Sequence, residues 1–214
     1  MKLFATLLLS TFIGTFAFAQ DWSSDVYKFR EQYPGYVITA SGEKIEGYIE
    51  YSDCYTLQKN IVFYAEKGNK KTKVKYSAED LLEYKMADKV WHVIHYSGGL
   101  MKKPLRGNLL VNTGCIAEYR WYEQAENFSS IRKQDGESDA EYHARLYPST
   151  VLYLKKGDEY PVSLDYFAFS FAKKMAEYVS DQPELSAKVA NKEKGYGMIS
   201  LLDIIAEYNK NCQE

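Results

Sequence analysis

The stretch from Tyr36 to Leu154 limits the fold more than any other feature, because it is a succession of short segments rich in Tyr, Val, Ile and Trp. Examples are YVITA, IEGYIEY, NIVFYA and KVWHVIHY, and Gly, Asn and charged residues separate them. β-branched and aromatic residues favour strands, and turns as short as SGEK, EKGNK and ADK are typical of hairpins. Residues 36–160 are therefore expected to form an antiparallel sheet of about eight or nine strands.

The composition becomes helical after Tyr160. An apolar stripe with helical spacing follows the capping residue Ser163, and it consists of Leu164, Phe167, Ala168, Phe171, Met175 and Val179. Pro183 at a first helical position predicts a second helix, and the capping-box spacing of Ser200 and Asp203 predicts another. About three helices are expected in residues 161–214, and their apolar faces must be buried against the sheet.

The expected fold class is therefore α+β. It combines a twisted antiparallel sheet with helices packed on one face or at one end of that sheet. A strongly curled sheet would approach a small open barrel, and the sequence leaves the flat and the curled forms open.

Residues 1–19 have the pattern of a secretory signal peptide. An apolar run from Leu3 to Ile13 follows a lysine, and the triplet AFA precedes Gln20. The run is short for a membrane-spanning helix of about 20 residues, and no later stretch is long enough. We expect an exported chain of 195 residues without a transmembrane segment, periplasmic or extracellular, in which residues 20–35 form an N-terminal segment.

Charge and cysteine content narrow the function classes. The chain has 27 basic and 29 acidic residues, a balance that does not indicate nucleic-acid binding. The three cysteines, Cys54, Cys115 and Cys212, would enter an oxidising compartment. They allow one disulfide between two of them, or three buried thiols, and their spacing matches no zinc motif.

Two of the three histidines lie in WHVIHY, which raises the question of a metal site. Successive side chains of a strand alternate between its faces, so His92 and His95 should point to opposite sides of the sheet. His143 is the third histidine. We therefore predict neither a metal site nor a cofactor.

The catalytic motifs GxSxG and HExxH are missing from the sequence, so no catalytic residue is predicted. An enzyme would have to assemble its acid–base pair from separate strands. The candidates for that hypothesis are Glu118, Asp165 and His95.

Tyrosine is frequent, at 20 of 214 residues. Tyr and Trp supply rigid, amphipathic contact area at binding surfaces, but they also fill the space between a sheet and its helices. The binding interpretation assigns an aromatic strand face to Trp91, His95, Tyr119 and Trp121. The alternative is that these residues belong to the core.

A polar insertion near residues 125–148 interrupts the sheet region. Ser138 and Glu141 have capping-box spacing, and Pro148 ends the segment, so a short helix is expected between them. Loops of this length are often functional. The insertion is either a mobile surface segment or the cover of a cleft for a glycan or small ligand.

Four stretches together resemble an uncharacterised family of secreted or periplasmic proteins from Bacteroidota. They are the hairpin GYVITASGEKIEGYIEY, the segment VKYSAEDLLEYK, the stretch VLYLKKGDEYPVSLDYFAFSFAKKMAEYVSDQPELSAKVANKE and the ending IIAEYNKNC. The resemblance extends from about Gly35 to Cys212. It implies a location in the cell envelope and carries over no functional residue, because the family has no assigned activity.

These features favour a non-catalytic envelope protein that binds another protein or an envelope component through the aromatic strand face. A glycan- or small-ligand-binding module with its cleft beneath the insertion is the second hypothesis. A hydrolase-type enzyme without a recognisable motif is the third.

Export predicts the N-terminus of the mature protein. Protein recovered from the periplasm or medium of a bacterial host should begin at Gln20, as measured by intact mass. An Ala19→Asp variant should retain its leader, because signal peptidase requires a small residue before the cleaved bond. Recovery of wild-type protein with residues 1–19 still attached would show that the leader is not a cleaved signal peptide.

Overall fold

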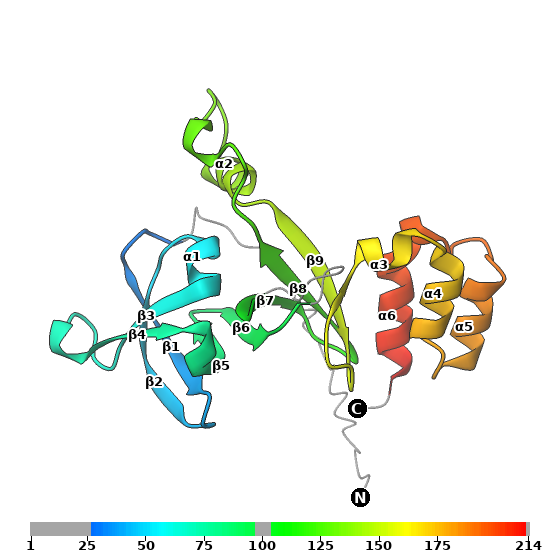
Figure 1. The fold of residues 1–214 in the computed structure, drawn as a ribbon, viewed down its shortest axis with the longest axis horizontal. Coiled ribbons are helices and arrows are strands. Elements are labelled where there is room, and N and C mark those ends of the chain that lie inside the picture. Colours follow the sequence, from blue (N-terminus) through cyan, green and yellow to red (C-terminus); the bar gives the residue numbers. More distant parts are fainter. Residues whose placement is uncertain (1–26, 97–103, 213–214) are drawn as a thin grey trace, which may run out of the picture.

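The computed structural model describes residues 27–96 and 104–212 (Figure 1). The predicted signal peptide and residues 20–26 of the N-terminal segment lie outside the described residues. The described chain has the expected α+β architecture, with ten strands in one antiparallel sheet and six α-helices.

The strands are β1 (Gln32–Thr39), β2 (Lys44–Glu50), β3 (Asn60–Tyr64), β4 (Lys73–Ser77), β5 (Leu81–Met86), β6 (Lys89–Ile94), β7 (Arg106–Asn112), β8 (Ile116–Tyr122), β9 (Ser149–Lys155) and β10 (Val162–Ser163). The α-helices are α1 (Cys54–Lys59), α2 (Asp139–Leu146), α3 (Leu164–Ala168), α4 (Phe171–Tyr178), α5 (Pro183–Ala190) and α6 (Leu201–Asn211). Short 3-10 turns include η2 (Ala78–Asp80) and η4 (Met198–Ser200).

The strand order is β10-β9-β8-β7-β6-β5-β1-β2-β3-β4. It follows the chain except that the β1–β2 hairpin is inserted so that β1 pairs with β5. The outer strands β4 and β10 do not pair with each other, so the sheet is open rather than a closed barrel.

The strands differ from the sequence prediction in two places. The additional strand, β10, has two residues, which is too short to show an alternating pattern. β1 begins at Gln32 rather than at Tyr36. Pro34 argues against a strand in the sequence, because it has no N–H to donate to a neighbouring strand. The structure tolerates it because pairing of β1 with β5 begins one residue later, at Gly35.

The C-terminal region has four α-helices instead of about three. The helix predicted after Ser163 is divided into α3 and α4, because Ser170 adopts a left-handed conformation with φ of 70°. Phe167, Met175 and Val179 of the predicted stripe are buried, whereas Leu164 and Ala168 are exposed, so only part of the stripe packs inward. Pro183 begins α5 as predicted.

Helix α1 was not predicted from the sequence, since it is too short for an apolar period to be visible. Asp53 starts it, because its carboxylate accepts hydrogen bonds from the Thr56 amide at 2.8 Å and the Thr56 hydroxyl at 2.7 Å. The helix contacts β3 as well as β7 and β8, although four strands separate β3 from β7 in the sheet. The sheet must therefore curl around α1 (Figure 1).

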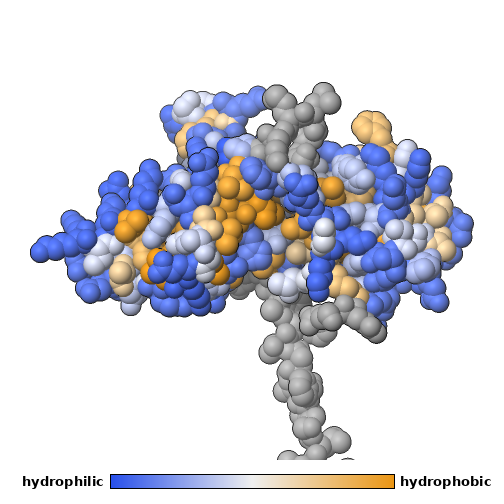
Figure 2. Space-filling model, turned by 60° about the horizontal axis from the view of Figure 1, so that its bottom comes forward, coloured by the Kyte–Doolittle hydropathy of each residue, from blue (hydrophilic) through white to orange (hydrophobic). Residues whose placement is uncertain are grey.

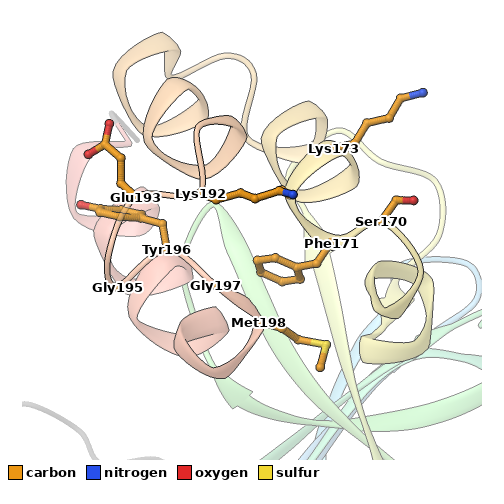
Figure 3. A pocket seen from close by; sticks show the side chains of 10 residues that line it. Ser170, Phe171, Lys173, Lys192, Glu193, Gly195, Tyr196, Gly197 and Met198 are labelled. Carbon is orange, nitrogen blue, oxygen red and sulfur yellow. The ribbon is translucent and has the colours of Figure 1, made fainter.

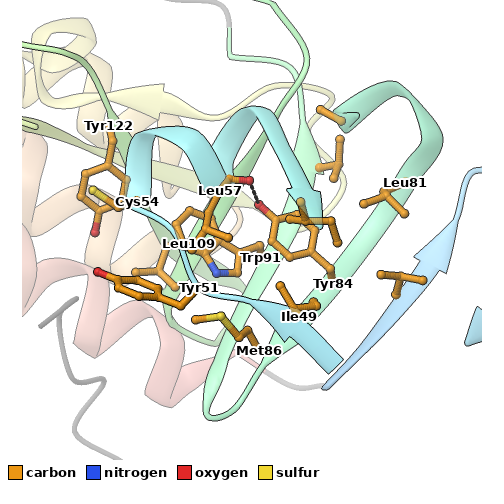
Figure 4. Packing of buried hydrophobic residues seen from close by; sticks show 14 of the residues in the cluster. Ile49, Tyr51, Cys54, Leu57, Leu81, Tyr84, Met86, Trp91, Leu109 and Tyr122 are labelled. Atoms are coloured by element: carbon orange, nitrogen blue, oxygen red, sulfur yellow. Dashed lines mark hydrogen bonds between the residues drawn. The ribbon is translucent and has the colours of Figure 1, made fainter. Parts of the chain in front are cut away.

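Two polar contacts fix α1 inside the curled sheet. The Tyr84 hydroxyl on β5 donates to the Leu57 carbonyl at 2.7 Å, as drawn in Figure 4. Gln58 is fully buried, and its amide donates to the Tyr122 carbonyl at 2.9 Å while its carbonyl accepts from the Tyr122 amide at 2.7 Å. Gln58 therefore pairs with the end of β8 as a neighbouring strand would.

The C-terminal helices are attached at the opposite end of β8. Cys115, just before β8, forms a disulfide with Cys212, just after α6, while the buried Cys54 takes no part in a disulfide. The Asn209 side chain on α6 accepts from the Ile116 amide at 2.8 Å and donates to the Ile116 carbonyl at 2.9 Å. The pairing that the sequence left open is thus Cys115 with Cys212.

Buried side chains form one large cluster around α1 and another between the C-terminal helices and β8–β10. Figure 2 shows hydrophobic side chains gathered near the middle of one face, with mainly hydrophilic side chains toward both ends. None of the described helices has the length and apolar character needed to cross a bilayer.

The Gln58 contact predicts a large loss of stability on truncation. Gln58→Ala should lower the free energy of unfolding by about 2 to 4 kcal/mol, because a buried amide and a buried carbonyl of Tyr122 lose their partners. Urea denaturation measures the change. Gln134→Ala removes an exposed glutamine and should change stability little; equal effects of the two substitutions would contradict the assigned role of Gln58.

Candidate functional site

The tryptophans and tyrosine of the predicted aromatic strand face are core residues. The exposed fractions are 0% for Trp91, 3% for Tyr119 and 1% for Trp121. Trp91 stacks on Tyr84 inside the curl, with ring centroids 5.8 Å apart. The strand register places Trp91 opposite Leu109, and Leu109 opposite Arg120, so these three residues share one face of the sheet. Trp121 follows Arg120 in β8 and therefore lies on the other face. The prediction of an aromatic binding face is therefore wrong for these three residues, because their buried rings cannot contact a partner.

The remaining sequence candidates do not form one site. His95 follows the end of β6 and is half-buried, and Asp165 is exposed on α3. Glu118 forms an ion pair with Arg120 at 3.3 Å on β8, two strands away from β6. Within the described ranges, no three His, Cys, Asp or Glu side chains are grouped closely enough to hold a metal ion.

A hydrogen-bonded chain of side chains crosses the outer face of the sheet at His92 on β6. The Tyr119 hydroxyl contacts His92 Nδ1 at 2.8 Å, and His92 Nε2 lies 3.3 Å from Glu83. Tyr36 on β1 donates to the same carboxylate at 2.6 Å. The chain therefore links β1, β5, β6 and β8.

Burial is the main influence on the pKa values of the side chains in this hydrogen-bonded chain. Burial lowers the pKa of His92, against the opposing effect of the Glu83 carboxylate. Burial, assisted by Glu83, raises the pKa of Tyr36 and of Tyr119 to about 12. His92 is therefore neutral at pH 7 and can donate from Nε2 to Glu83 while Nδ1 accepts from Tyr119. The side chains of the hydrogen-bonded chain are hydrogen-bond partners for one another, which favours a structural role for them.

A cleft of about 720 Å³ lies beside the polar insertion. Three separate segments meet there: the chain before β1, the loop after β2, and α2 with the residue that follows it. Its aromatic lining residues are Tyr27, Phe29, Tyr51, Tyr142 and Tyr147, and its polar lining residues are Lys28, Asp53, Asp139 and His143. The cleft thus combines aromatic rings with hydrogen-bonding groups, as small-molecule sites do.

The insertion is an ordered part of the fold rather than a loose loop. The predicted capping box is present, with Ser138 and Glu141 each bonding to the other's backbone. Arg145 makes a two-pronged contact to Glu137, with distances of 2.6 and 2.8 Å, and also donates to the Arg132 carbonyl. The Arg145 contact lowers the pKa of Glu137 to about 2, so this link is intact at neutral pH.

The aromatic residues of the cleft divide into buried rings and partly exposed rings. Tyr147 is buried, stacks on Tyr55 at 6.0 Å and contacts Phe128 at 5.5 Å. Burial, with the nearby Asp53 carboxylate, raises the pKa of Tyr147, so its hydroxyl stays protonated. Phe29 is 65% exposed and Tyr142 is half-buried, so part of each ring faces the cleft or water. The guanidinium groups of Arg30 and Arg145 lie 5.4 and 5.9 Å from the centres of these two rings, respectively.

The sequence indicated a cleft near the insertion but not which residues line it. Residues 27–29 and 51–53 lie on loops far from the insertion in the sequence, and only the curl of the sheet brings them together with α2. The sequence signal that could have found them is the position of Tyr27, Phe29 and Tyr51 just outside the strands β1 and β2. Comparisons with protein-family models, curated proteins and solved structures gave no match.

The hydrogen-bonded chain predicts a pH dependence of stability. Since burial lowers the pKa of His92 below that of the unfolded chain, the unfolded state binds the proton more readily as pH falls below about 6.5. The stability that neutral His92 contributes is complete above that pH and is lost on acidification. The control is His92→Asn, whose amide offers an oxygen where Nδ1 accepts and does not titrate.

Urea denaturation of both proteins between pH 5 and pH 8 measures this effect. The advantage of wild type over His92→Asn should shrink at pH 5. An advantage that grows at pH 5 would instead indicate that the ion pair with Glu83 outweighs burial.

Proposed function

We propose that this protein is an exported, non-catalytic binding protein of the cell envelope that holds a glycan in the cleft beside the insertion. The proposal rests on one observation: five aromatic residues and four polar side chains from three chain segments surround a cleft of about 720 Å³. Sugar rings present C–H faces that pack against the negative faces of aromatic rings, and hydroxyl groups that need hydrogen-bond partners. The cleft supplies both kinds of contact.

Binding is favoured over hydrolysis by the roles of the two carboxylates in the cleft. Asp53 caps α1 through both of its oxygens. Asp139 lies in the first turn of α2 and forms an ion pair with Lys133, which lowers its pKa. A glycosidase needs one carboxyl group with a raised pKa to act as the acid. Carboxylates already engaged in holding helices suit a site that binds its ligand unchanged.

Export is supported by the disulfide. Cys115 and Cys212 are separated by 97 residues in the chain, and their link closes the C-terminal helices onto the sheet. Structural disulfides persist in oxidising compartments and are rare in the cytosol. This agrees with the signal-peptide pattern of residues 1–19 and with an envelope location.

The proposal predicts saturable glycan binding. The purified protein should bind at least one member of a panel of peptidoglycan fragments and plant, fungal and bacterial oligosaccharides, detected on an array and quantified by calorimetry. Phe29→Ala and Tyr142→Ala should each weaken that binding about tenfold, because loss of one stacked ring costs about 1 to 1.5 kcal/mol.

Tyr48→Ala is the matched control, since Tyr48 is also half-buried but lies on β2 away from the cleft. Its affinity should equal that of wild type. Absence of binding across the panel, or binding that Phe29→Ala and Tyr142→Ala leave unchanged, would refute the proposal.

A further inference from the structure

A second cleft, of about 680 Å³, lies among the C-terminal helices (Figure 3). It is bounded by the start of α4 on one side and by the turn between α5 and η4 on the other. Phe171 and Met198 supply its main apolar side chains. It shares no lining residue with the aromatic cleft.

Exposed apolar residues adjoin lining residues of this cleft in the sequence. Phe169 is 83% exposed and adjoins the lining residue Ser170, while Ile199 is fully exposed and adjoins Met198, itself 46% exposed. Large apolar residues gathered at one site on a surface indicate contact with an apolar group. The apolar lining and these exposed neighbours, together called the apolar mouth, therefore favour a ligand with a hydrocarbon part.

Lys173 and Lys192 both line this site, and Lys192 is the one whose side chain reaches into it (Figure 3). Its side chain extends across the cleft toward α4, whereas Glu193 and Tyr196 point to the opposite side (Figure 3). The Tyr196 hydroxyl donates to Glu207, which also pairs with Lys188. In residues 27–96 and 104–212 no ion pair engages Lys192, so its ammonium can meet an anionic ligand.

The backbone at Lys192 strengthens this assignment. The residue has φ of 55°, follows the C-cap Asn191 of α5, and occupies the left-handed position of a helix-ending motif. The Lys192 amide bonds to the Val189 carbonyl and the Glu193 amide bonds to the Lys188 carbonyl, each at 3.1 Å. Glycine is the preferred residue at that position because it has no Cβ. A lysine there is unfavourable for the backbone, which points to a use for its side chain.

We propose that this cleft binds a single-chain amphiphile, with its hydrocarbon tail against Phe171 and Met198 and its anionic head group on Lys192. The volume is in the range of small-molecule sites, about 300 to 1,000 Å³. The head group is a carboxylate or a phosphate, since an ammonium attracts either as a point charge. The inference stands independently of the glycan proposal, because the two clefts are separate.

Calorimetry with the purified protein tests the tail and the head group separately. Octanoate, decanoate and dodecanoate, used below their micelle concentrations, should bind with an affinity that rises about fourfold for each added CH2. Dodecyl phosphate in place of dodecanoate identifies the better head group. Dodecyltrimethylammonium should bind at least tenfold more weakly, because its cation meets Lys192.

Lys192→Gly separates ligand binding from folding. The substitution should keep or raise the thermal midpoint, because glycine suits the left-handed position, but should weaken dodecanoate binding at least tenfold. Lys194→Ala removes a positive charge two residues away, outside the cleft lining, and should leave the affinity unchanged.

Any one of the following results would overturn the proposal. The first is no binding of any anionic amphiphile. The second is equal binding of anionic and cationic amphiphiles, or equal effects of Lys192→Gly and Lys194→Ala. The third is binding to anionic lipid vesicles without binding to monomeric amphiphiles, which would make the apolar mouth a membrane-contact surface instead.

Discussion

The curl of the sheet around α1 is the constraint on which the rest of the structure depends. A helix of one and a half turns gains little stability by itself, so α1 must be held by tertiary contacts. Gln58 provides the decisive one, because it completes the hydrogen bonding of Tyr122 inside the core. With α1 in place, β3 and β8 are brought to the same helix although they lie far apart in the sheet.

The β8–β9 hairpin carries the two candidate sites at its opposite ends. The insertion with α2 joins the strands at the Tyr122 end, next to α1 and the aromatic cleft. The C-terminal helices are fixed at the Ile116 end by the disulfide and by Asn209 (Figure 1). The aromatic cleft has rings and hydrogen-bonding groups, whereas the helical cleft combines the apolar side chains of Phe171 and Met198 with Lys173, Lys192 and Glu193. The chemistry of the two clefts therefore favours different ligands.

Tyrosine content proved ambiguous because the same residue type performs two tasks. Tyr84 and Tyr119 place their rings in the interior and their hydroxyls on a carbonyl and a histidine, so each polar atom is satisfied on burial. Tyr142 keeps its ring partly exposed beside a cleft. Strand alternation separated Trp91 from Trp121, and burial removed both from the surface, which a count of aromatic residues cannot reveal.

The sequence by itself determined the α+β class, an antiparallel sheet of about eight or nine strands and the start of α5 at Pro183. Alternation, turn residues and proline act through local backbone preferences. The sequence also indicated the capping box of α2, which needs residues only three apart. Tertiary structure alone decided the division of the C-terminal helix at Ser170, the pairing of Cys115 with Cys212 and the residues around each cleft. These features depend on contacts between segments distant in the chain, and the free energy of such contacts appears only when the sheet has curled and the helices have packed against it.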